Sequence, residues 1–294
     1  MNKVKIAVFG EILWDIFGEE KTIGGAPFNF AAHASRLGAE VGLVSAVGSD
    51  ELGEMAVSAA EGFGVDTEHI ARVDAPTGYC RVTLSDGKPS YELVRGVAYD
   101  MIPEPDAKIT ADAFYFGTLA ARSSVSESTL SSLLDGDYRE IFFDINIRQS
   151  YYTDALINAS LSRATIFKLS REEMSAVSEP RHATLADARS YEDVCRSIAE
   201  RYANLRLIIL TLDCDGALVY ETATGIIHRS PKPTSPAVST VGAGDSFSAC
   251  FLVNYLRGAG IGASLSRATA LSDYVVTQLG AVPEYPENLY CEIM

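Results

Sequence analysis

A glycine-rich run at residues 239–247 contains residues that could catalyse the transfer of a charged group. It reads Ser-Thr-Val-Gly-Ala-Gly-Asp-Ser-Phe, and apolar residues spaced by three or four follow it, which is typical of a helix start. Gly242, Ala243 and Gly244 allow close backbone approach, and the first turn of a helix leaves N–H groups free for an anion. Asp245 in the same turn can accept a proton. The run therefore predicts an anion site beside a base, as phosphoryl transfer to an alcohol requires.

The same run could also serve only as a helix cap, since the helix dipole favours Asp245 near an N-terminus. It is not a dinucleotide-binding fingerprint, because Phe247 stands where Gly-x-Gly-x-x-Gly needs its last glycine. No Gly-x-x-x-x-Gly-Lys-Ser/Thr occurs in the chain either. These residues alone leave the chemical and the structural interpretations open.

A second glycine turn lies far upstream, at residues 24–29, and reads Gly-Gly-Ala-Pro-Phe-Asn. An apolar helix that ends at Gly38 is expected after it. Pro27 suits the first turn of that helix, and the paired glycines permit tight backbone approach. Asn29 should project early from the helix, although a plain strand-to-helix connection would look similar.

The elements that would position these turns follow an alternating pattern. Continuous apolar runs at 4–9 and 41–47 predict strands that are buried on both faces. From residue 113 onward strands and helices alternate, which predicts a mainly parallel sheet with helices on both faces and function at the carboxyl ends of its strands. The strands are expected at 113–116, 140–144, 165–169 and 207–211, and the helices near 51–63, 126–134, 155–159, 172, 191–202, 245–256 and 265–275.

Polar residues follow three of these strand ends. Asn146 and Arg148 come after the strand that ends at Asp144, and the segments 170–173 and 211–216 follow the next two. Each has a structural explanation as loop chemistry, since Ser170 and Glu173 form a Ser-x-x-Glu capping box. Their shared place at one sheet edge nevertheless predicts that they line one site.

Two segments alternate between polar and apolar residues instead of forming continuous apolar runs. Residues 79–84 and 91–94 alternate around a turn at 85–89, which predicts a β-hairpin with a polar face. Asp15 lies in another alternating piece, where it could be a half-exposed surface residue. Arg95 could reach a pocket or could be a solvated cation at the strand end.

Taken together, the two glycine turns resemble the paired motifs of the ribokinase-like (PfkB) carbohydrate kinases. The resemblance implies one α/β kinase domain over residues 1–294, with a small β lid formed by about 11–24 and 77–97. It implies that Asp245 is the catalytic base and that Gly242, Ala243 and Gly244 form the anion hole. The sugar-binding residues that it implies are Asp15, Gly25 and Asn29.

The same resemblance assigns the strand-end residues to the nucleotide. Asn146, Arg148, Thr211 and Gly216 are expected near ATP, and Glu173 is expected to organise Mg²⁺ through water. The chain departs from the family pattern at three positions, where Ser170 replaces Asn, Asp213 replaces Gly, and Ser239 replaces an acid that often ligates potassium. The resemblance therefore does not extend to activation by a monovalent cation.

Composition limits the function classes. The chain has 294 residues, 47% of them hydrophobic, and no apolar run that approaches the length of a membrane span. Its formal net charge of −15 argues against a nucleic-acid or anionic-membrane partner. Its five cysteines form no Cys-x-x-Cys pair, which indicates a cytoplasmic protein with reduced thiols.

The sequence therefore predicts an ATP-dependent kinase for a sugar hydroxyl. The segments Gly-Gly-Ala-Pro, Phe116-Gly-Thr-Leu-Ala, Asp-x-Asn-x-Arg and Lys168-Leu-Ser-x-Glu-Glu look most like fructokinases. Ribose, 2-keto-3-deoxygluconate or a nucleoside stay open as acceptors, and so does a catalytically silent sugar or nucleotide sensor. A homodimer is a further hypothesis, because lids in this family sometimes pair between subunits.

Overall fold

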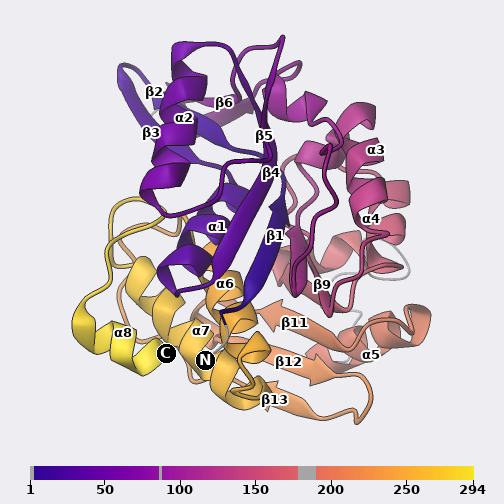
Figure 1. The fold of residues 1–294 in the computed structure, drawn as a ribbon. Helices are drawn as coiled ribbons and strands as arrows, with labels where there is room; N and C mark the ends of the chain where they lie inside the picture. Colours follow the sequence, from indigo (N-terminus) through magenta and orange to yellow (C-terminus); the bar gives the residue numbers. More distant parts are fainter. Residues whose placement is uncertain (1–2, 86–87, 178–189) are drawn as a thin grey trace.

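A nine-stranded sheet organises residues 3–85, 88–177 and 190–294, the parts of the chain that the computed structural model describes (Figure 1). Neighbouring strands from β11 to β5 are parallel, whereas β12 and β13 are antiparallel at one edge. The mainly parallel sheet that the alternating pattern predicts is therefore confirmed. From one edge to the other the strands are β13 (Ile227–Arg229), β12 (Ala217–Glu221), β11 (Leu207–Thr211), β10 (Ile166–Ser170), β9 (Glu140–Asp144), β8 (Ala113–Phe116), β1 (Lys5–Phe9), β4 (Glu40–Gly48) and β5 (Ile70–Val73).

Helices cover both faces of this sheet (Figure 1). Side chains alternate along the strands, so Ile6 and Val8 pack on one face while Ala7 and Phe9 pack on the other. One face carries α1 (Ala26–Arg36), α2 (Glu51–Gly62), α6 (Ala243–Leu256) and α7 (Ile261–Val275), and the other carries α3 (Ser124–Leu133), α4 (Asp154–Leu161) and α5 (Tyr191–Arg201). The remaining helices are α8 (Glu287–Ile293) and the short 3₁₀ segments η1 (Ala98–Met101), η2 (Ala120–Arg122), η3 (Glu172–Ala176) and η4 (Asp213–Asp215).

Helix α6 lies where the sequence predicts a helix, and it is enclosed along most of its length. Every residue from Asp245 to Asn254 is buried. The helix packs between α1 and α7, so it has almost no solvent side. Asp245 therefore projects from one of the most enclosed helices in the fold.

A small second sheet, which we call the lid sheet, contains β3 (Glu20–Gly24), β2 (Leu13–Phe17), β6 (Tyr79–Ser85) and β7 (Lys88–Leu93) in that order. Strand β2 runs antiparallel to β3 and parallel to β6. The Trp14 side-chain N–H donates to the Leu52 carbonyl oxygen at 3.0 Å, which ties the lid sheet to α2. The predicted turn at 85–89 includes Asp86 and Gly87, which lie outside the described residues.

Two further features of the structure concern the cysteines and the helices. All five cysteines are free. No helix in the described parts of the chain combines the length and the apolar character that crossing a membrane requires.

Candidate active site

One cavity of about 950 Å³ lies where the carboxyl ends of the central strands face the N-termini of α1 and α6. Every site residue predicted from the sequence lines this cavity. They are Asp15, Gly25, Asn29, Asn146, Arg148, Glu173, Thr211, Gly216, Gly242, Ala243, Gly244 and Asp245. Segments from most of the chain length therefore meet at one edge of the sheet.

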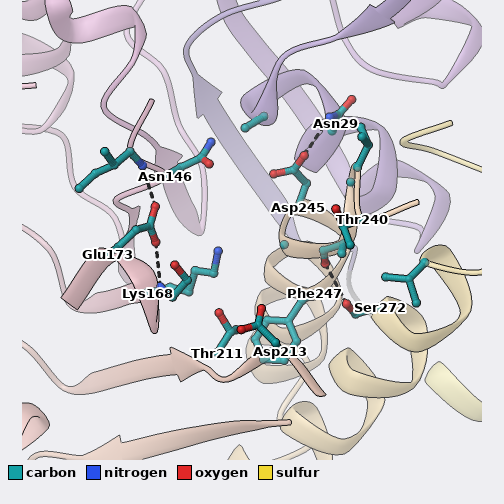
Figure 2. A pocket seen from close by; sticks show the side chains of 18 of the residues that line it. Asn29, Asn146, Lys168, Glu173, Thr211, Asp213, Thr240, Asp245, Phe247 and Ser272 are labelled. Atoms are coloured by element: carbon teal, nitrogen blue, oxygen red, sulfur yellow. Dashed lines mark hydrogen bonds between the residues drawn. The ribbon is translucent and has the colours of Figure 1, made fainter. Parts of the chain in front are cut away.

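The two glycine turns meet directly. The Asn29 side-chain amide donates a hydrogen bond of 2.8 Å to the Asp245 carboxylate, and this bond spans 216 residues of sequence. Figure 2 shows these two side chains on one side of the cavity, with Asn146, Glu173 and Lys168 on the other. Asn29 and Asp245 are 5% and 8% exposed, so the bond is shielded from bulk water.

Each turn needs glycine for a steric reason. Gly25 has φ 106° and Gly242 has φ 82°, which side chains rarely adopt. A Cβ atom on Gly25 would lie 2.5 Å from the Glu11 carbonyl oxygen, and one on Gly242 would lie 2.2 Å from the Ala281 carbonyl oxygen. Both turns therefore press their backbones against neighbouring main chain while they face the cavity.

The loops after the strands also adopt unusual backbone conformations. Asn146 and Asp213 have φ of 39° and 51°, and Gly216 has φ 86°. The value at Asp213 gives a physical reason why glycine is usual in the family at this position. Strained residues of this kind are frequent at ligand sites.

Glu173 fixes two of these loops in place. Its carboxylate accepts hydrogen bonds from the backbone N–H of Ile147 at 2.7 Å and of Ser170 at 2.8 Å (Figure 2). The second of these is half of the capping box that the sequence indicates. Carboxylate oxygens keep further lone pairs, so Glu173 could still accept from a metal-bound water.

Lys168 is a site residue that the sequence motifs did not predict. Its ammonium lies 3.0 Å from the Asp144 carboxylate, which also accepts from the Ser248 hydroxyl at 2.9 Å. A Cβ atom on Gly244 would lie 3.2 Å from the Lys168 nitrogen, so the ammonium abuts the first turn of α6. Burial alone would lower the pKa of Lys168, but Asp144 and Glu173 raise it above its usual value, and the side chain stays charged.

Three acids with raised pKa values face the other end of the cavity. Burial raises the pKa of Asp245 to about 6, although the Asn29 hydrogen bond opposes the shift. Burial raises the pKa of Glu11 to about 7 and also raises the pKa of Asp15. The positive charge of Arg148 lowers the pKa of each of these acids. Arg148 follows β9, and its positive charge also reaches the expected sugar-binding side of the cavity.

Of the two roles considered for Arg95, a pocket residue or a solvated cation, the structure supports the solvated cation. It is exposed, is not among the residues that line the cavity, and stacks over the Tyr151 ring at 4.6 Å. Ser239 does not line the cavity either. The Val276 carbonyl oxygen beside it already accepts from the N–H groups of Val238 and Ser239.

Glu11 and Lys168 could have been found by a simpler signal than a motif. Lys168 is a charged residue inside the apolar strand β10, and Glu11 follows the apolar strand β1 with only one residue between. A charged group in such a place is costly to bury unless it is paired or functional.

Within the described residues, no group of three or more His, Cys, Asp or Glu side chains is arranged to hold a metal by itself.

Comparison with known proteins identifies the class. The sequence matches the pfkB family of carbohydrate kinases over residues 3–288, and the chain belongs to that family. Aminoimidazole riboside kinase of Salmonella typhimurium is 30% identical over 312 residues, which cover 97% of this chain and 92% of that protein. An ATP-dependent 6-phosphofructokinase of Thermoanaerobacterium thermosaccharolyticum is 24% identical over 310 residues, with the same two coverages.

A solved structure shows the same fold. Fructokinase with bound ATP from Xylella fastidiosa superposes with a TM-score of 0.83 at 22% identity, over 98% of this chain and 97% of that one. The family resemblance inferred from the two glycine turns is thus confirmed, and so is the enzyme class of phosphotransferase with an alcohol group as acceptor. The acceptor differs among these similar proteins.

Proposed function

We propose that this protein is an ATP-dependent sugar kinase that phosphorylates fructose, with Asp245 as the base. The hydrogen bond between Asn29 and Asp245 carries the proposal, because it joins the expected sugar turn to the expected phosphate turn. Asp15 and Gly25 would hold the sugar on the lid side. Asn146, Thr211 and Gly216 would hold the nucleotide at the strand ends, and Arg148 would reach both substrates.

In this mechanism the sugar hydroxyl oxygen bonds to the γ-phosphorus as the bond to the β,γ-bridging oxygen breaks. The electron pair of that bond leaves with ADP, and the hydroxyl proton passes to Asp245. A carboxylate with a pKa of about 6 is mostly ionised at neutral pH, so it can accept this proton. Most of the acceleration would come from holding the two substrates in line.

The charge that develops on the phosphoryl oxygens would meet two fixed groups. The N–H groups at the start of α6 have no side-chain cap, and the Lys168 ammonium abuts the same turn. Mg²⁺ bound to the ATP phosphates would neutralise further charge. The remaining lone pairs of Glu173 suit a water-mediated contact with that ion, whereas no direct protein cluster is available among the described residues.

Fructose is favoured over other sugars by the segments that resemble fructokinases and by the similarity to the Xylella fastidiosa fructokinase. The test is release of ADP, measured over a panel of fructose, ribose, 2-keto-3-deoxygluconate, aminoimidazole riboside and fructose 6-phosphate. We expect the highest kcat/KM with fructose. A higher value with any other member would overturn the fructose assignment but not the kinase.

The same assay separates an enzyme from a silent sensor. Asp245, the second glycine turn and Asn29 are all present, which favours catalysis. If wild-type protein binds sugar and ATP but releases no ADP with any member of the panel, the sensor is the better description.

The lid pairing that a homodimer would use can be tested by sedimentation, where a single monomeric species at micromolar concentration would contradict it.

A further inference from the structure

Five carboxyl side chains are buried in the described parts of the chain, and their partners divide them into two groups. Asp100, Glu140 and Asp144 each form a salt bridge, with Arg122, Arg206 and Lys168 respectively. Glu11 and Asp245 form none among the described residues, and both line the cavity. Burial of an unpaired acid is costly, so a ligand is the expected partner of such a group.

Glu11 is held where it can reach a ligand in the first glycine turn. Its carbonyl oxygen and its Cγ atom lie 2.5 and 3.3 Å from the position of a Cβ atom on Gly25. Its own N–H and the Ala26 N–H at the start of α1 lower the pKa of its carboxyl group, so the carboxyl group lies near both. The side chain is 3% exposed, yet it lines the cavity together with Asp15 and Asn29.

We propose that Glu11 is a sugar-binding residue, whose carboxyl group hydrogen-bonds one hydroxyl of the acceptor and so positions the reacting hydroxyl against Asp245. This inference rests on the proposed function. One carboxylate oxygen can lie near the Ala26 N–H while the group still offers a hydrogen bond to the sugar. Glu11 would thus help to select among acceptors, whereas Asp245 takes the proton.

The protonation state of Glu11 fits this role. Burial raises its pKa to about 7 with a smaller contribution from the neighbouring Asp245 charge, while its own N–H, Arg148 and the Ala26 N–H oppose the shift. At neutral pH the group therefore exists in both forms. The protonated form donates to a hydroxyl oxygen, and the ionised form accepts from a hydroxyl hydrogen.

The test combines two variants with a series of deoxy sugars. Glu11→Gln keeps the shape and the hydrogen-bonding groups, and Glu11→Met keeps the shape alone. We expect Glu11→Met to weaken sugar binding by about 10- to 100-fold, with KM for ATP within about twofold of wild type, and Glu11→Gln to restore most of the loss. Calorimetric binding of sugar is measured beside ADP release.

The deoxy series distinguishes contact from structural support. If Glu11 contacts one hydroxyl, the deoxy sugar that lacks it binds wild type weakly but binds Glu11→Met as well as the parent sugar does. Glu140→Gln is the matched control, because Glu140 is 1% exposed but lies outside the cavity. We expect it to leave the deoxy pattern unchanged.

Four results separate the inference about Glu11 from the proposed kinase activity. An identical deoxy pattern in wild type and Glu11→Met overturns the inference and leaves the kinase intact. Sugar binding with the predicted pattern but without ADP release supports Glu11 and overturns the kinase. A wild-type protein that binds no sugar overturns both, and a loss in Glu11→Met that Glu11→Gln does not restore assigns Glu11 a structural role.

Discussion

The two glycine turns share one backbone conformation but differ in the N–H donors that they offer a ligand. Each has a positive-φ glycine at the N-cap of a helix, Gly25 for α1 and Gly242 for α6. At α1, the Ala26 N–H lies near the Glu11 carboxyl group and lowers its pKa, Pro27 has no N–H, and the Asn29 N–H donates to the Gly25 carbonyl oxygen. Among the described residues only the Phe28 N–H of this first turn is left without an acceptor.

Helix α6 keeps two of its first N–H donors. The Ala243 N–H donates to the Thr240 carbonyl oxygen at 3.3 Å, and that of Ser246 donates to the Gly242 carbonyl oxygen. Among the described residues no acceptor takes the N–H groups of Gly244 and Asp245. The comparison teaches that a helix N-terminus becomes an anion site only when its first turn is left unsatisfied. The second turn therefore suits phosphate and the first suits a neutral sugar.

Asp245→Asn should give the largest effect. Asparagine keeps an oxygen for the Asn29 amide, so we expect the fold and both substrate affinities to persist. Loss of the base should lower kcat by about 10²- to 10⁴-fold. Steady-state ADP release, with sugar binding measured by calorimetry, checks this prediction. A kcat within tenfold of wild type would show that the second turn does not supply the base.

Alanine at the two N-cap glycines tests the comparison itself. We expect Gly25→Ala to raise KM for the sugar and Gly242→Ala to raise KM for ATP, each by about tenfold or more, because the new methyl group would displace the turn. Gly62→Ala is the control, since a Cβ atom there has no neighbour within 4 Å. If both variants raise the same KM, the two turns do not divide the substrates.

The buried acids make stability depend on pH in a defined direction. The pKa of Glu11 rises from 4.5 in the unfolded chain to about 7 in the folded protein, so the folded state binds more protons between these values. The free energy of unfolding should therefore fall as pH rises through this window, by about 3 kcal/mol for Glu11 alone. Glu11→Gln should remove that part of the decline.

Urea unfolding of wild type and Glu11→Gln at pH 5 and pH 8 measures the difference. Asp245 remains in both proteins, so its contribution cancels to first order. The same decline in wild type and variant would mean that Glu11 is ionised in the folded protein at low pH, and would weaken its proposed role as a donor.

Asn29→Ala tests the hydrogen bond that joins the two turns. We expect a smaller effect on activity than from the preceding substitutions. The Asn29 hydrogen bond lowers the pKa of Asp245, so its loss should raise that pKa above about 6. The acidic limb of the pH profile of kcat/KM should then move to higher pH. An unchanged limb would indicate that another group governs this ionisation.

Asp213→Gly should give the smallest effect. Glycine accepts a φ of 51° without strain and removes a carboxylate from the side of the cavity where we expect the nucleotide. We expect KM for ATP to fall by about two- to threefold, and stability to change by less than about 1 kcal/mol. A rise in KM would show that Asp213 contacts ATP or its metal ion.

Much of the fold could be predicted because its strands are buried on both faces. The strands at 113–116, 140–144 and 207–211 have the predicted bounds, since a continuous apolar run ends where the strand meets the polar site. The polar edge strand β3 and the short strand β13 have no such run, and were not separately predicted. Strand β12 does have an apolar run, Ala217–Tyr220, and was missed as well. The positions of β3 and β13 depend on pairing partners rather than on local pattern.

The cavity was predictable where backbone constraints leave a motif. Gly25 and Gly242 must be glycine for steric reasons, so they stand out in the sequence. Glu11 and Lys168 carry no such backbone constraint. The sequence shows only a charge within or beside an apolar strand, and its significance is clear once burial and the absence or presence of a partner are known. Single buried charges carry chemistry that sequence spacing does not encode.

A structure of the protein with fructose and a non-hydrolysable ATP analogue tests the central claim most directly. The account predicts that the reacting hydroxyl lies about 3 Å from the Asp245 carboxylate, with the γ-phosphate against the N–H groups at the start of α6 and the sugar at the first glycine turn. A phosphate bound at α1, or a reacting hydroxyl beside another acid and away from Asp245, would contradict it.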